Sequence, residues 1–231
     1  IILSLWVTSL VGLLSIDLST APLTVLLAIA CGRTFLQTGL FVIAHDAMHG
    51  NLAPHSKRLN DRLGAIAVGL YACLPYRQSC INHTQHHRKP GQPGDPDFHD
   101  GTHDHPALWY INFLKSYISL RCFVTLLFSG SLVFGIFEHL AATSVMQFLW
   151  VWALPLILSS MQLFFFGTYL PHRNERDYGR GLCQIYRPHS GEYWQYLWSL
   201  LSCYHFGCYH REHHYSPKTP WYRLPSVVVL P

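Results

Sequence analysis

The chain has 231 residues, of which 50% are hydrophobic and only 12% are charged, with 16 Lys and Arg against 12 Asp and Glu and a formal net charge of +4. Because an average soluble domain carries roughly 25% charged residues, this composition predicts a membrane protein. The basic residues are scattered between apolar segments, which argues against nucleic-acid binding. The length and the absence of long Pro, Gly or Ser tracts predict a single domain over residues 1–231.

The N-terminal segment predicts a helical hairpin across a membrane. Residues 1–16 are apolar and fit the end of a first spanning helix, and a short polar turn follows at residues 17–22. Residues 23–44 are mostly apolar and would make roughly 33 Å of helix, which is enough to cross a hydrocarbon core. This predicted span leads directly into His45-Asp46-Ala47-Met48-His49.

The middle of the chain predicts shorter elements. Residues 51–61 are a polar loop, and residues 63–74 give an apolar helix that is too short to span, so we expect it to be buried or interfacial. Residues 89–99 repeat Pro and Gly, which prohibit a helix and predict an ordered loop. Residues 107–121 mix aromatic, apolar and basic side chains and are expected at the membrane interface.

The C-terminal half predicts a second spanning hairpin. Residues 122–137 and 145–170 are its two apolar arms, with a turn at residues 138–143. Residues 192–206 form a predicted aromatic-rich helix that is too short and polar to be a confident span. The fold class expected is therefore an all-α integral membrane protein with four transmembrane helices in two hairpins, accompanied by interfacial helices.

Basic residues set the expected orientation. Neither of the two turns opposite the histidine-rich segments contains Lys or Arg, so the positive-inside rule places those segments on the cytoplasmic face of a multi-pass protein. The alternative is a soluble all-α protein, which is disfavoured because soluble interiors seldom need apolar runs of this length. The basic residues on the histidine side are Lys57, Arg58, Arg62, Arg77, Arg88, Lys89, Arg173, Arg176, Arg180, Arg187, Arg211, Lys218 and Arg223.

Three histidine boxes predict a metal site. Residues three and four apart lie on one face of a helix, so each box can direct two or three imidazoles at one point. Neutral imidazole suits Fe, Zn, Cu or Ni, and eight such ligands exceed what one ion accepts, which indicates two ions. The boxes lie at residues 45–49, 83–87 and 210–214, and their histidines are His45, His49, His83, His86, His87, His210, His213 and His214.

Four carboxylates are candidates to orient these rings and to offset the charge of the metal ions: Asp46, Asp95, Asp97 and Glu212. Turn formation is an equal alternative for Asp95 and Asp97, and an exposed charge is the alternative for Glu212. The seven cysteines form no CxxC pair and are expected to be reduced.

The identity of the metal decides which reactions the site could catalyse. Zinc would support hydrolysis, whereas a paired iron site with open positions can activate O₂ for attack on unactivated C–H bonds. A site just under the membrane surface suits a lipid-soluble substrate. The sequence contains no flavin, haem or iron–sulfur motif, so electrons are expected from a separate protein.

The boxes resemble those of the membrane fatty-acid desaturase and hydroxylase superfamily. Within it, the chain is similar to the bacterial and cyanobacterial β-carotene ketolases from about residue 35 to residue 225. The segments that carry this resemblance are TGLF at residues 38–41, GDPDFH at 94–99, FGTYLPH at 166–172, CYHFGCYH at 203–210 and TPWYRLP at 219–225.

The resemblance implies a di-iron centre with two Fe²⁺ ions among four membrane helices, in an O₂-dependent monooxygenase of carotenoid biosynthesis. With the orientation given by the basic residues, the expected fold carries a cytoplasmic histidine-rich di-iron cap. It implies that the C4 ring methylene of β-carotene is hydroxylated twice and loses water to give a ketone, yielding echinenone and canthaxanthin. It also implies a ferredoxin-like electron donor. It adds His172 as a ninth iron ligand, although His205 competes for that role and could instead be a hydrogen-bonded structural histidine.

Other functions could use a similar set of histidines. A carotenoid 3-hydroxylase or a fatty-acid desaturase would use the same di-iron chemistry on another position or substrate. A metal transporter would place its ligands near the bilayer midplane, whereas these cluster beyond the helix ends. A carotenoid-binding protein without activity would not need nine convergent histidines.

Overall fold

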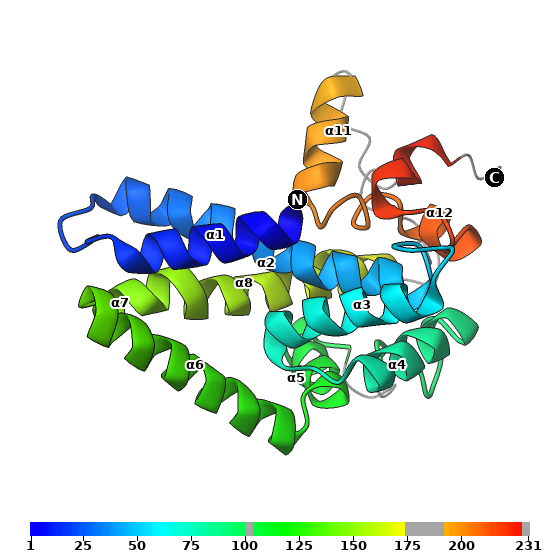
Figure 1. The fold of residues 1–231 in the computed structure, drawn as a ribbon. Helices are drawn as coiled ribbons and strands as arrows, with labels where there is room; N and C mark the ends of the chain where they lie inside the picture. Colours follow the sequence, from blue (N-terminus) through cyan, green and yellow to red (C-terminus); the bar gives the residue numbers. More distant parts are fainter. Residues whose placement is uncertain (100–103, 174–191, 228–231) are drawn as a thin grey trace.

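The computed structural model describes residues 1–99, 104–173 and 192–227, and these residues contain helices and no β-strand. The predicted all-α class is therefore confirmed for the described part of the chain. Helices α1 (Ile2–Ser15), α2 (Leu23–Met48) and α8 (Leu154–Gln162) lie in one layer, and α6 (Leu120–Ala141) leans away from it (Figure 1).

Three helical segments are long and apolar enough to cross a membrane, namely Leu23–Met48, Leu120–Ala141 and Val145–His172. Helix α1 has 14 residues, which is roughly 21 Å and too short to span by itself. Three of the four predicted spans thus meet the length criterion, and the four-crossing topology stays a prediction.

Helices α1 and α2 are joined by buried polar contacts. Arg33 is only 2% exposed, and its Nη1 donates to the Trp6 carbonyl at 2.8 Å. The Trp6 indole in turn donates to Gln37 Oε1 at 2.6 Å. Since polar groups in a span must be paired within the protein, these bonds fix how α1 lies on α2.

The last long segment contains two π-helical turns. It runs through α7 (Val145–Phe148), η1 (Leu149–Ala153), α8, η2 (Leu163–Tyr169) and α9 (Leu170–His172). Pro155 has no N–H to donate to the carbonyl four residues earlier, which belongs to Val151. Arg33 Nε donates to that carbonyl at 3.1 Å, so the wider turn is stabilised from α2.

Two helices bring the second histidine box to the end of α2. Helix α3 spans Lys57–Ala72, so it begins within the stretch predicted as a polar loop, because Ser56 caps its first turn by accepting from the Leu59 N–H. Helix α4 (Tyr76–Arg88) follows after a short turn. Asn60 Nδ2 donates to the Ala47 carbonyl at 2.7 Å and holds α3 against α2. The predicted non-helical loop at residues 89–99 is confirmed.

The remaining helices surround this end of α2. Helix α5 (Pro106–Tyr117) covers most of residues 107–121, whose interfacial placement stays a prediction, whereas α11 (Glu192–Leu201) ends before the predicted boundary at residue 206. The cause is a left-handed turn, with φ values of 76° at Cys203, 52° at Tyr204 and 73° at His205, which stops the helix. Helix α12 (His210–Tyr215) and the 3₁₀ helix η4 (Trp221–Ser226) complete the described chain.

Candidate metal centre

Nine histidines from four helices meet in two groups, and the nitrogen atoms within each group lie within 4.8 Å of one another. The helices are α2 with its C-terminal cap, α4, α9 and α12. The five-histidine cluster consists of His45, His49, His83, His87 and His213, and the four-histidine cluster consists of His86, His172, His210 and His214. The structure thus brings together every histidine that the sequence analysis proposed as a ligand.

Helix periodicity explains the division. On α4, His83 and His87 are four residues apart and share a face, while His86 is rotated by roughly 100° from its neighbour and enters the other cluster. On α12, His210 and His214 share a face and His213 points to the five-histidine cluster. Each HxxHH box therefore supplies both clusters.

The ring nitrogens approach one another at distances that a shared ion would impose. Two imidazole ligands at right angles, each roughly 2.1 Å from a metal ion, would be separated by about 3 Å. In the structure the Nε2 atoms of four pairs are 2.7–3.1 Å apart: His49 and His83, His87 and His213, His86 and His214, and His172 and His210. These donor sets fit two metal ions.

Most of these imidazoles are neutral near pH 7, the form that binds metals. Burial lowers the pKa of His49 to about 4, and burial together with the neighbouring histidines lowers the pKa of His87 to about 3. The same causes hold the pKa well below its usual value for His83, His210, His213 and His214.

His86 has carboxylates behind it. Its Nδ1 lies 3.0 Å from each oxygen of Asp95 and 3.8 Å from Asp97 Oδ2. Burial alone would lower the pKa of His86, but the charge of Asp97 and the hydrogen bond to Asp95 raise it. Since an ionised Asp95 can only accept, Nδ1–H donates and Nε2 is left to face the cluster.

The loop at residues 89–99 shows that turn formation and ring orientation are not exclusive. Asp95 also accepts from the Gly91 N–H at 2.7 Å and from the Asp97 N–H at 2.9 Å. These bonds and His86 lower the pKa of Asp95 against the effect of burial. Tyr117 Oη donates to Asp97 Oδ1 at 2.5 Å. Tyr117 was not singled out in the sequence, because nothing in its interfacial segment marks it as a partner of Asp97.

The other two candidate carboxylates, Asp46 and Glu212, are also buried, and Asp46 makes no hydrogen bond to a cluster histidine. Asp46 is buried and its Oδ2 accepts from the Trp221 N–H at 3.2 Å, while its Oδ1 is 3.8 Å from His45 Nδ1, which is too long for a hydrogen bond. Glu212 is 6% exposed, so the alternative of an exposed charge is wrong.

His205 lies apart from both clusters. Its Nδ1 is 2.7 Å from Ser199 Oγ, and its ring stacks on Trp221 with centroids 6.0 Å apart. His172, not His205, is the isolated histidine that joins the four-histidine cluster. Nearby, Cys208 is in a disulfide, so the expectation of reduced cysteines is wrong at this position, and Cys183 lies outside the described residues.

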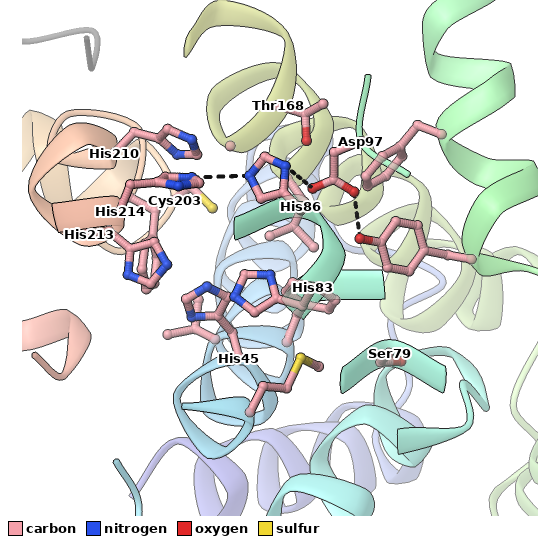
Figure 2. Close-up of a pocket in the computed structure, with 18 residues that line it drawn as sticks. His45, Ser79, His83, His86, Asp97, Thr168, Cys203, His210, His213 and His214 are labelled. Atoms are coloured by element: carbon pink, nitrogen blue, oxygen red, sulfur yellow. Dashed lines mark hydrogen bonds and ion pairs between the residues drawn. The ribbon is translucent and has the colours of Figure 1, made fainter. Parts of the chain in front are cut away.

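Two cavities meet beside the clusters. The smaller one, about 70 Å³, is lined by histidines of both clusters and by Asp97 and Thr168 (Figure 2). The second, about 380 Å³, is lined almost entirely by apolar side chains of α2, α3, α5, α6, α8 and η2. The two cavities share the lining residues Phe41, Phe113, Tyr117 and Leu163. An apolar molecule in the larger cavity would have its end beside the imidazoles.

Comparisons with known proteins agree with this geometry. A model of the family described as fatty acid desaturase matches residues 20–230. Beta-carotene ketolases from two Paracoccus strains are 41% and 38% identical, covering 87% and 92% of this chain and 79% and 82% of the relatives. A zeaxanthin 4-ketolase from Chlamydomonas reinhardtii is 38% identical over 96% of this chain and 48% of its own length. No solved structure matches.

Proposed function

The chain belongs to the fatty acid desaturase family, and from that membership we propose that it is a membrane-bound carotenoid ketolase with two iron ions. The observation that carries the proposal is the convergence of nine imidazoles in two clusters at the end of an apolar cavity. The names of the relatives supply the substrate class, because they are β-carotene and zeaxanthin ketolases.

The five-histidine and four-histidine clusters would each hold one ion. When bound, the iron pair supplies the reduction of O₂ that oxidation of an unactivated C–H bond requires. The protein supplies neutral ligands, because burial disfavours protonated imidazole. Asp95 and Asp97 would keep the His86 ring in one orientation and offset part of the charge of the ion beside it.

The proposed reaction is the conversion of the C4 methylene of a β-ionone ring to a ketone. In each of two rounds a C–H bond at C4 is replaced by C–OH, one atom of O₂ leaves as water, and two electrons and two protons are consumed. The resulting geminal diol then loses water to give the carbonyl. Action on one ring of β-carotene would give echinenone, and action on both rings would give canthaxanthin.

The apolar cavity suits a hydrocarbon substrate. Its lining is aromatic and aliphatic, with the hydroxyls of Tyr110 and Ser160 bonded to each other at 2.6 Å. Since it adjoins the histidine-lined cavity, a ring could reach the clusters while the polyene extends toward α6. Helix α6 exposes a long apolar face, including Phe128 at 70% and Leu120 at 78%, that lipid and polyene could cover.

The membrane placement proposed is four crossings with the boxes on the cytoplasmic face. The three long apolar helices support a membrane protein. The proposal adds α1 as part of a fourth crossing and uses the basic residues around the boxes to assign the side. In intact cells, a reagent that does not cross the membrane should label the Ser19→Cys variant and not the Lys57→Cys variant. Equal labelling of the two variants would contradict the assignment.

Electrons would enter through α4. Its outer face borders a groove with three exposed cations, Arg77, Arg88 and Lys89, that make no ion pair with a described carboxylate. The opposite face of the same helix carries His83, His86 and His87. An acidic, ferredoxin-like donor would suit this groove. Arg88→Glu should raise the KM for reduced ferredoxin and leave kcat near normal, and an unchanged KM would exclude the groove.

Pigment analysis tests the function. Cells that make β-carotene should accumulate echinenone and canthaxanthin when they express this chain and not when they express its His86→Ala variant. Hydroxylated carotenoids without ketones would indicate a 3-hydroxylase. Normal ketone production by the variant would contradict the role of His86 as an iron ligand. Unchanged β-carotene with well-expressed protein would point to a different lipid substrate, such as a fatty acid.

A further inference from the structure

Thr168 places a hydroxyl group at the inner end of the substrate path. It lies in η2, one helical turn before His172, and lines the small cavity together with His86 and Asp97 (Figure 2). The residue is 3% exposed, so its hydroxyl is shielded from bulk solvent. The hydroxyl therefore meets the cavity rather than bulk solvent.

This hydroxyl has no partner within the described residues, unlike the other buried threonines there. Thr38 Oγ1 donates to Gln162 Oε1 at 2.6 Å, and Thr143 Oγ1 donates to the Leu14 carbonyl at 2.5 Å. A hydroxyl that faces a cavity and makes no bond within the described protein is available to a molecule in that cavity. A polar group of a molecule in this cavity could therefore form a hydrogen bond with Thr168.

The helix around Thr168 differs from the α-helices of this chain. Two threonines in α-helices of this chain donate to the carbonyl four residues earlier, Thr34 to Ala30 at 2.7 Å and Thr125 to Arg121 at 2.8 Å. Thr168 lies in a π-helical turn, where that carbonyl has a different position relative to the side chain. Its hydroxyl makes no such bond and is presented to the cavity.

The surroundings limit what the hydroxyl could bind. The carboxylate of Asp97 lines the same cavity and would repel an acid, and the other lining groups are imidazoles and apolar side chains, apart from Tyr117 and Ser79. Those two hydroxyls are already used, because Tyr117 donates to Asp97 and Ser79 donates to the Pro75 carbonyl at 3.2 Å. A neutral alcohol, which both donates and accepts, complements Thr168.

Resting on the proposed ketolase function, we propose that Thr168 forms a subsite for a hydroxyl group on the ring that is being oxidised. β-Carotene is a hydrocarbon and offers no such group when it first binds. The hydroxyl would come either from the first oxidation at C4, in which case Thr168 retains the alcohol for its second oxidation, or from C3 of a ring that arrives already hydroxylated. Both sources present the same chemistry at neighbouring carbons.

Product ratios in three variants test the subsite. Thr168→Val removes the hydroxyl and keeps the shape, Thr168→Ser keeps a hydroxyl, and Thr34→Val makes the same change where the hydroxyl is bonded within its own helix. Each is expressed in cells that supply β-carotene and in cells that supply zeaxanthin, with iron per chain measured on the purified protein. Affinity for each pigment, measured by quenching of tryptophan fluorescence, gives a readout without turnover.

If the alcohol is the enzyme's own intermediate, Thr168→Val should lower the ketone-to-alcohol ratio from β-carotene about 5- to 10-fold at normal iron content. If the hydroxyl is at C3, Thr168→Val should weaken zeaxanthin binding relative to β-carotene by a similar factor. Thr168→Ser should keep the product ratio and the binding affinity of the unaltered chain. Ratios and affinities equal to those of Thr34→Val would overturn the subsite, whereas absence of ketone from the unaltered chain would instead overturn the proposed function.

Discussion

The five-histidine and four-histidine clusters are built from the same helices, but they differ in what lies behind their rings. In the four-histidine cluster, His86 Nδ1 is 3.0 Å from both oxygens of Asp95, with Asp97 close by. In the five-histidine cluster, the described carboxylate nearest to a ring is Asp46, whose Oδ1 is 3.8 Å from His45 Nδ1. One cluster thus has more imidazoles, and the other has negative charge at hydrogen-bond distance.

The difference suggests two ways of holding similar ions. Five neutral imidazoles contribute more ligand nitrogens but no charge, whereas a ring bonded to an ionised carboxylate is more basic and offsets part of the charge of the ion. We infer that the two proposed irons are not equivalent. The ion in the four-histidine cluster should depend on the loop at residues 89–99, and the other ion should not.

The largest effects are expected from removing one ligand of each cluster. His86 and His87 are adjacent in the chain but enter different clusters, so His86→Ala and His87→Ala form a matched pair. Each should lower ketone formation at least about 100-fold, because losing a ligand should cost no less than losing an outer partner. Pigment analysis at equal protein levels measures this, and near-normal activity of either variant would show that its cluster is not needed.

Removing a carboxylate should affect the two clusters to different degrees. Asp95→Asn keeps the shape but removes the charge behind His86, so metal affinity or activity should fall about 10- to 100-fold. Asp46→Asn should have a smaller effect, because Asp46 makes no hydrogen bond to His45. Iron titration of the purified variants checks this order. Equal losses in both variants would mean that the asymmetry of the clusters has no energetic consequence.

Tyr117 offers a finer test, since it bonds Asp97 and lines both cavities. Tyr117→Phe keeps the ring and removes one hydrogen bond, so activity should fall roughly 3- to 10-fold. The four-histidine ion should be perturbed while the other ion keeps its spectrum. Mössbauer spectra of iron-57 protein report each ion separately, and a change confined to the five-histidine ion would contradict the assignment.

The smallest effect is expected for a histidine outside both clusters. His139 is in the last turn of α6, on a helix that supplies no cluster residue. His139→Ala should change ketone production by less than about twofold, as is usual for a substitution away from packed or paired groups. A loss as large as that of His86→Ala would show that this end of α6 is part of the site.

Much of the arrangement could be predicted from residue spacing. The helical period places the box histidines on common faces, and Pro and Gly at residues 89–99 identify the loop that carries Asp95. The split of each HxxHH box between two clusters was not predicted. That split depends on how α4 and α12 are rotated against each other, which is a property of packing rather than of spacing.

Single residues were harder to find than repeated ones. His172 has no partner at helical spacing, so only the resemblance to a family proposed it. The end of α11 at Leu201 was missed because three consecutive non-glycine residues adopt positive φ, which local propensity disfavours. Thr168 looks like any threonine in an apolar helix, and its proposed role follows from its place at the wall of the cavity, which spacing does not reveal.

The central claim is that the two clusters hold two iron ions, and metal analysis of the purified protein tests it most directly. The unaltered chain should contain about two irons per chain, and His86→Ala and His87→Ala should each retain about one, with different Mössbauer spectra because the remaining ion differs. One metal ion per chain in the unaltered protein, zinc in place of iron, or the same residual spectrum in both variants would contradict the account.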